Sequence, residues 1–202
     1  MANTLSKFKS ILNGGGARPN LFEVGIADFP GYDKGVAEDI KFLCKGASLP
    51  ESTVGLVEVP FRGRTFKVAG DRTFAPWSIT IINDTDFRVR NAMETWMQFI
   101  AQYQDGSGTA DPEKYMFDAT VSQLLRDPTT LGATSGKGTH GARTDAGQYT
   151  FYDIWPTSIS AIDLSYDSSD VIEEFTVEFQ VNYWAPTLKK NDAGAEATTA
   201  AD

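Results

Sequence analysis

The stretch Glu174-Phe-Thr-Val-Glu-Phe-Gln-Val-Asn182 decides the fold class of this chain. Its side chains alternate strictly between apolar and polar, which is the pattern of a β-strand with one buried face and one solvated face. The apolar set is Phe175, Val177, Phe179 and Val181. The opposite set is polar and carries two carboxylates: Glu174, Thr176, Glu178 and Gln180. The sequence therefore predicts a sheet strand whose second side faces water.

Further strand-like runs, separated by turn residues, occupy much of the chain. Runs rich in β-branched and aromatic residues predict strands at 21–26, 40–45, 54–61, 65–68, 77–82, 119–125, 149–155 and 159–165. The short link Arg62-Gly63-Arg64 between two of these runs predicts a hairpin. Residues 28–39, which include Pro30-Gly31, are expected to form a loop.

One segment has helical periodicity. Its apolar residues recur at a spacing of three or four and form a single stripe: Val89, Met93, Trp96, Met97 and Ile100. We expect the apolar face of 174–182 to pack against this stripe, and the oxygen-bearing side chains of 83–86 to cap the helix start. Because most elements are strands joined by hairpins, the expected fold is mainly β: an antiparallel β-sandwich or barrel with one flanking α-helix.

The 202 residues are expected to form one domain with irregular ends. Residues 1–16 end in a glycine run and are expected to be a flexible lead, and 17–186 hold the β domain. Within the domain, 129–147 is polar and glycine-rich, which predicts a mobile insertion, and 187–202 predicts a disordered tail. Neither a signal peptide nor a transmembrane span is expected, because long apolar runs are absent from the sequence.

Composition narrows the possible functions. The formal net charge is −9, with 12 basic and 11 acidic residues in 1–104 but 6 basic and 16 acidic residues in 105–202. Such a chain is a poor nucleic-acid clamp, because duplex binders concentrate Lys and Arg. The single cysteine, Cys44, excludes an internal disulfide, and the single histidine leaves little for metal sites. We expect no catalytic residue, cofactor or metal.

Four segments, taken in order, resemble the tail tube family of contractile-tailed bacteriophages. They are 17–24 (Ala-Arg-Pro-Asn-Leu-Phe-Glu-Val), 68–74 (Val-Ala-Gly-Asp-Arg-Thr-Phe), 77–84 (Trp-Ser-Ile-Thr-Ile-Ile-Asn-Asp) and 155–184. The resemblance spans about residues 17–185, from which the insertion and the tail depart. It implies a structural virion protein whose sheets are pooled into the inner barrel of a hexameric ring. Such rings stack into a hollow tube inside a contractile sheath.

The resemblance also implies the partners of the protein. They are further copies of the same chain, the tail sheath protein, the tape-measure protein, and the baseplate and tail-terminator proteins. DNA is expected to pass through the bore during ejection into the host without specific binding. The protein is expected to be assembled in the host bacterial cytoplasm and to be part of the phage tail.

Two groups of residues are candidate sites in such a tube. The basic cluster near the hairpin turn is expected to reach a neighbouring subunit or ring, since its charge complements the acidic second half of the chain: Arg62, Arg64, Lys67 and Arg72. The polar set Glu174, Thr176, Glu178 and Gln180 is expected to face the bore, where carboxylates repel phosphate. A position of this strand on the tube exterior is the alternative.

Other functions fit the sequence as alternatives. A baseplate-proximal tube initiator, or the tube of a phage-derived contractile injection or type VI secretion system, would need the same single domain. Outside this class, the four tryptophans of the chain suit a carbohydrate-binding β-sandwich, and its Asp and Glu residues suit a hydrolase.

Overall fold

The computed structural model describes residues 4–11, 17–124, 145–167 and 169–187. The chain divides into two compact units. The larger unit comprises Glu23–Val121 and Thr150–Trp184 and holds most of the described elements, whereas the remaining residues belong to the other unit. The short helices α1 (Thr4–Ile11) and α4 (Pro112–Tyr115) belong to different units. Among the described helices, none is long and apolar enough to cross a membrane.

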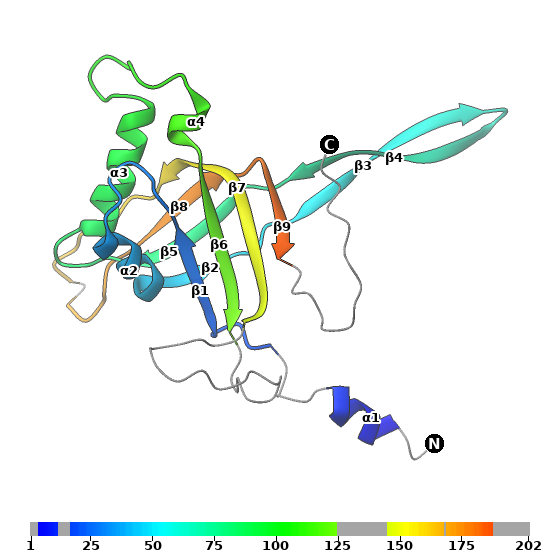
Figure 1. Ribbon diagram of the computed structural model, residues 1–202, viewed down its shortest axis with the longest axis horizontal. Helices are drawn as coiled ribbons and strands as arrows, with labels where there is room; N and C mark the ends of the chain where they lie inside the picture. The colour runs from blue at the N-terminus through cyan, green and yellow to red at the C-terminus, as the bar shows by residue number, and fades with distance from the viewer. Residues whose placement is uncertain (1–3, 12–16, 125–144, 168, 188–202) are drawn as a thin grey trace. The chain divides into compact units, whose positions relative to one another are not determined.

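A seven-stranded sheet forms the frame of the protein (Figure 1). The strand order is β1-β6-β7-β8-β5-β2, and β9 pairs with β7. Their bounds are β1 Phe22–Ile26, β2 Cys44–Ala47, β5 Trp77–Ile82, β6 Phe117–Leu124, β7 Asp145–Ile159, β8 Glu174–Gln180 and β9 Tyr183–Thr187. Strand β5 pairs antiparallel with both β2 and β8, and β8 pairs antiparallel with β7. The prediction of a mainly antiparallel β fold is confirmed.

Along β8, buried apolar side chains alternate with more exposed polar side chains, as predicted. Phe175, Val177 and Phe179 are at most 1% exposed, and their neighbours across the sheet on β5 are equally buried. Helix α3 (Arg88–Ile100) covers this side, where the Trp96 ring lies 5.9 Å from that of Phe179. The predicted packing of the strand against the helix stripe is therefore confirmed at this contact.

The start of α3 differs from the prediction. Its N-cap is Phe87 in the left-handed region, with φ 54°, and no side chain caps the helix. The side chain of Asn83 instead donates to Glu173 at 2.9 Å, so it is engaged with another segment. The expected capping by 83–86 is therefore wrong. The Asn83 side chain is used in a tertiary hydrogen bond. A tight turn, in which the Phe87 N–H donates to the Asp84 carbonyl, separates the other side chains from the helix start.

A second helix, α2 (Lys34–Leu43), occupies residues for which a loop and a strand were predicted. Asp33 caps it by accepting a hydrogen bond from the Val36 N–H at 2.8 Å, and Val36 and Ile40 bury the same helix face. The strand predicted at 40–45 is therefore wrong up to Leu43, and β2 begins at Cys44. The spacing of two apolar residues by four, after an Asp cap, was the overlooked signal.

Strand β7 runs through Pro156, where two separate strands were predicted. The register with β8 shifts between Pro156 and Ser158, and such an irregularity accommodates a residue without an N–H. After Ile159 the chain makes one more backbone hydrogen bond, from the Ser160 N–H to the Thr176 carbonyl, and then leaves the sheet. The strand predicted at 159–165 is wrong beyond Ile159.

Strands β3 (Ser52–Phe61) and β4 (Arg64–Phe74) form the predicted hairpin as a separate two-stranded sheet (Figure 1). Its turn residues, Arg62 and Gly63, have φ values of 45° and 79°. Positive φ at both positions gives the twist that matches two antiparallel strands. Strand β4 is longer than the predicted run at 65–68. Of the predicted insertion, 129–144 lies outside the described residues, as does the tail from residue 188.

Candidate functional site

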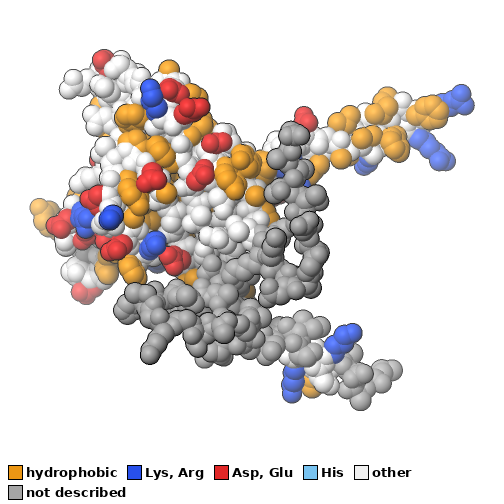
Figure 2. All heavy atoms as spheres, viewed as in Figure 1, with side chains coloured by type: hydrophobic (Ala, Val, Ile, Leu, Met, Phe, Trp, Pro, Cys, Tyr) orange, Lys and Arg blue, Asp and Glu red, His pale blue; other side chains and the backbone are white. Residues whose placement is uncertain are grey.

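The hairpin presents an apolar face to solvent. Residues paired across an antiparallel ladder point to the same side, and Val57 pairs with Val68 while Val59 pairs with Phe66. We call the resulting set the hairpin face: Val57, Val59, Phe61, Phe66 and Val68. These side chains are between 42% and 67% exposed. Figure 2 shows hydrophobic side chains along the length of the hairpin.

The predicted basic cluster lies on this hairpin but is not gathered into one site. Arg62 and Arg64 are at the tip, where Figure 2 shows basic side chains, and the Arg62 guanidinium lies 5.4 Å from the Phe61 ring centre. Lys67 belongs to the opposite face and pairs with Glu58 at 3.8 Å, between two exposed side chains. Arg72 lies further along β4, opposite Val54. The cluster is thus a basic tip followed by two separate cations.

The hairpin face is a feature that the sequence interpretation missed. The alternation of Val57, Val59 and Phe61 was visible in the sequence, but it was taken only as evidence for a strand. Strand alternation normally indicates which side is buried, and here that side is exposed in the described structure. An uncovered apolar surface of this kind marks a docking surface.

The second candidate site is the polar side of the β5–β8 pair. Pairing places Ser78 opposite Glu178, Thr80 opposite Thr176, and Ile82 opposite Glu174. The predicted polar set is therefore on the side of the sheet opposite the buried aromatic core. Glu174 and Glu178 are exposed, and Thr176 and Gln180 are half-buried.

Hydrogen bonds and ion pairs tie this polar side together across strands. The hydroxyls of Thr80 and Thr176 lie 3.3 Å apart, and the Ser158 hydroxyl donates to the Glu178 carboxylate at 3.2 Å. Lys45 of β2 forms an ion pair with Glu174. The surface is hydrophilic, and hydrogen bonds between its short side chains hold it in place. The negative charge of its two carboxylates is only partly balanced, by the ammonium group of Lys45.

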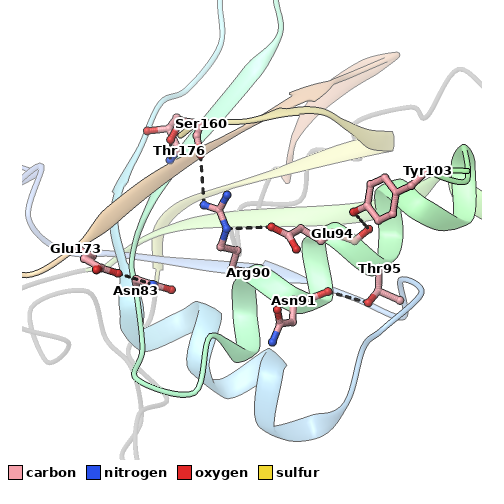
Figure 3. Close-up of polar contacts among 9 residues, drawn as sticks. All are labelled: Asn83, Arg90, Asn91, Glu94, Thr95, Tyr103, Ser160, Glu173 and Thr176. Carbon is pink, nitrogen blue, oxygen red and sulfur yellow. Dashed lines mark hydrogen bonds and ion pairs between the residues drawn. The ribbon is translucent and has the colours of Figure 1, made fainter. Parts of the chain in front are cut away.

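A third feature is the link between β7 and β8, residues 160–173, which we call the anchored loop. Figure 3 shows both of its ends held by polar contacts. At the first end, the Ser160 hydroxyl accepts a hydrogen bond from the Thr176 N–H at 2.9 Å, and the Ser160 carbonyl accepts one from Arg90 at 3.3 Å. At the second end, Glu173 accepts the hydrogen bond from Asn83. Arg90 itself is fixed by Glu94, 3.0 Å away on the same helix.

The titratable groups give little sign of catalytic chemistry. A backbone hydrogen bond from Val36 holds the pKa of Asp33 below its usual range, and hydrogen bonds from Ser107 do the same for Asp105. A general acid at neutral pH needs a shift in the other direction. Burial raises the pKa of the Cys44 thiol to about 11, which makes that thiol a weak nucleophile. Within the described residues, no group of three or more His, Cys, Asp or Glu side chains is arranged to hold a metal.

The tryptophans do not form an exposed platform for sugar rings. Trp77 and Trp96 are fully buried, and Trp155 and Trp184 are half-buried. Trp77 stacks on Phe151 at a centroid distance of 4.7 Å, and the Trp96 indole N–H donates to the Tyr115 carbonyl at 2.9 Å. These contacts are those of core residues, so they disfavour the carbohydrate-binding alternative.

Comparison with known proteins identifies relatives over most of the chain. The family model described as "Phage tail tube protein" matches residues 17–186. The tail tube protein gp19 of Enterobacteria phage T4 is 31% identical over 168 residues, which cover 83% of this chain and 90% of that protein. The residues matched by the family model include the hairpin, α3 and the anchored loop.

Solved structures share the fold at low sequence identity. The tube-terminating cap of the anti-feeding prophage has a TM-score of 0.58 and 15% identity, covering 86% of this chain and 92% of that chain. The sheath–tube complex of an extracellular contractile injection system, PVC, has a TM-score of 0.55 and 13% identity, covering 88% and 95%. At this identity the similarity describes the fold.

Proposed function

The chain belongs to the phage tail tube protein family and is a structural tail tube protein of a contractile-tailed phage, and from this premise we propose that its copies form stacked hexameric rings around a bore that conducts DNA. The observation that carries the proposal is the two-sided β5–β8 pair. One side is sealed by an aromatic core and α3, and the other is a hydrophilic wall with Glu174 and Glu178. Such a wall suits an aqueous channel.

The polar set Glu174, Thr176, Glu178 and Gln180 lines this bore in the proposed assembly. Carboxylates repel the phosphates of passing DNA, so the DNA slides without the contacts that would retain it. The Thr80 and Thr176 hydroxyls bond to each other and the Ser158 hydroxyl donates to Glu178, which leaves fewer donors to bind phosphate. The wall therefore conducts DNA without specific binding.

Ring closure joins sheets of neighbouring copies. Strands β1 and β2 end the described sheet, and unpaired strand edges are templates for pairing with another chain. Pooling the strands of six copies into one barrel removes these edges. Of the predicted basic residues, Arg62 and Arg64 at the hairpin tip then serve contacts between subunits or rings, whereas Lys67 pairs with Glu58 on the other face and Arg72 lies further along β4.

The other proposed partners follow from the place of a tube in a phage tail. They are the sheath protein around the tube, the tape-measure protein inside it, and the baseplate and terminator proteins at its ends. The sheath is favoured as a partner because the same fold occurs in a sheath–tube complex. We assign the protein a purely mechanical role without catalysis, with assembly in the host cytoplasm before it becomes part of the virion.

Electron microscopy of the purified protein tests the assembly. Negatively stained samples, concentrated stepwise, are expected to contain rings with six-fold symmetry and tubes made of them. Particles that stay monomeric at all concentrations, or rings with another symmetry, would contradict the proposal.

The bore lining is tested by reversing charge at Glu174 and Glu178. Changing both to Lys is expected to permit tube assembly and to slow DNA ejection, most strongly at low salt, where phosphate attraction is least screened. A matched control changes two exposed acids on helices, Glu38 of α2 and Glu113 of α4, to Lys, so the net charge changes equally. Equal ejection rates for both variants at every ionic strength would place Glu174 and Glu178 outside the bore.

A further inference from the structure

The anchored loop displays apolar side chains that the described structure leaves uncovered. Leu164, Tyr166, Val171 and Ile172 are between 67% and 108% exposed. Together with their neighbours they line a cavity of about 730 Å³. Large apolar residues gathered around a cavity, at the surface of an otherwise well-packed unit, mark a binding surface.

The anchored loop is also strongly acidic. Residues 160–173 contain four carboxylates and no Lys or Arg: Asp163, Asp167, Asp170 and Glu173. Asp163 and Glu173 are among the residues that line the cavity. The surface therefore suits a partner that is apolar and carries positive charge.

The ends of the loop are fixed, so its exposed side chains are presented from a defined base. Ser160 is bonded to both β8 and α3, and Glu173 is bonded to Asn83 through side chain and backbone. A surface held at both ends loses less conformational freedom when a partner binds.

The hairpin complements the anchored loop, because it is also apolar but carries the opposite charge. Its face combines five exposed apolar side chains with the arginines at its tip, and residues 52–74 hold four basic and two acidic residues. A two-stranded hairpin is marginally stable in water by itself, so a partner that covers this face stabilises it. The hairpin and the anchored loop belong to the same compact unit, and the apolar side chains of both are exposed in it. The hairpin of a chain therefore does not cover the anchored loop of that same chain.

We propose that the anchored loop is the docking surface for the hairpin face of a second copy of this chain, with Arg62 and Arg64 beside the acids of the loop. The inference rests on the proposed self-assembly and adds the receptor for the hairpin. Apolar contact provides most of the stabilisation, because exposed ion pairs contribute little. The charges select the orientation.

Cross-linking between differently labelled copies tests the contact. In a Cys44→Ala background, Phe61→Cys subunits are co-assembled with Tyr166→Cys subunits, and the tubes are oxidised and separated on a non-reducing gel. A disulfide-linked dimer is expected from this pair. The matched control replaces Tyr166→Cys with Phe42→Cys, which is 84% exposed on α2, and is expected to give no such dimer.

Charge exchange supplies a second test that does not depend on cysteine geometry. Arg62→Glu with Arg64→Glu is expected to slow tube growth at least tenfold, as is Asp163→Arg with Asp167→Arg. Combining all four changes in one chain is expected to restore growth to within threefold of the original protein. Thermal unfolding of each free subunit controls for folding.

The outcomes separate this inference from the proposed function. Tubes that form without a Phe61–Tyr166 cross-link, or a combined charge variant that grows no faster than either parent, would overturn the hairpin–loop contact and leave the tube intact. Absence of rings and tubes from the unmodified protein would overturn the proposed function, and this contact with it.

Discussion

The β5–β8 pair and the β3–β4 hairpin have the same strand chemistry and opposite burial. Both are antiparallel, and both carry a row of apolar side chains on one side: Phe175, Val177 and Phe179 on β8, and the hairpin face on β3 and β4. On β8 the apolar side is at most 1% exposed, whereas the hairpin face is at least 42% exposed. The difference comes from α3, whose Trp96 packs on β8, while no described helix covers the hairpin face.

This contrast separates two kinds of stability in one chain. The β5–β8 pair is stabilised by contacts within the subunit and is complete before assembly. The hairpin face has its apolar side chains exposed in the subunit, and in the proposed assembly a second copy buries them. In an assembling protein, strand alternation therefore indicates a side that will be buried, without saying whether the subunit or the assembly buries it.

The largest effect on the difference between the two regions is expected from removing the α3 side chain that packs on β8. Trp96→Ala is expected to lower the free energy of unfolding of the subunit by about 3–5 kcal/mol, because it deletes a large buried side chain and leaves a cavity. Chemical denaturation of the free subunit measures this loss. Tyr103→Ala, at a side chain that is 70% exposed, is the control and is expected to change the value by less than about 0.5 kcal/mol. A loss for Trp96→Ala as small as for this control would show that α3 does not hold the β8 core.

Polar substitution on the hairpin face is expected to have the opposite effect: it prevents assembly and leaves the stability of the free subunit nearly unchanged. Val59→Thr with Phe66→Thr keeps strand-forming β-branched residues but removes apolar surface from the hairpin face. The free energy of unfolding of the free subunit is expected to change by less than about 0.5 kcal/mol, while tube assembly is lost. Denaturation and sedimentation measure the two effects.

The matched control for this variant lies on the other side of the same strands. Glu58→Thr with Lys67→Thr removes only the exposed ion pair and is expected to leave assembly intact. If this control abolishes assembly as fully as the variant of the hairpin face, the apolar face is not the side that binds.

Thiol reactivity gives the smallest of the expected effects and compares the two regions with one reagent. The pKa of Cys44, about 11, leaves about a thousandth of it as thiolate at pH 8, and its side chain is buried. Labelling of Cys44 in the native subunit is therefore expected to be slow and to become fast in denaturant. A cysteine introduced as Phe66→Cys is expected to react at once in the free subunit. Equal rates at both positions would contradict the assigned burial.

Much of the fold was predictable because it depends on local alternation. The strand at 174–180, the hairpin turn at Arg62-Gly63 and the helix stripe around Trp96 all follow from side-chain spacing. The errors occur where tertiary contacts decide. Helix α2 is held by an Asp33 cap and by packing against α3 and the sheet, and Asn83 bonds to Glu173, 90 residues away, in place of capping α3.

The candidate sites were predictable only in part. The polar side of β8 follows from its alternation, but the bond between Ser158 and Glu178 depends on strand pairing that a single sequence does not specify. The acids of residues 160–173 are visible in the sequence. Their association with a cavity became apparent only once both loop ends were located.

Hydrogen exchange, measured in the free subunit and in assembled tubes, tests most directly whether a second copy covers the hairpin. Amides of β5 and β8 are expected to exchange slowly in both states, because their ladder is backed by the core. Amides of β3 and β4 are expected to exchange fast in the free subunit and to become strongly protected in the tube, together with those of the anchored loop. Hairpin amides that exchange at the same rate in the free subunit and in the tube would contradict the account.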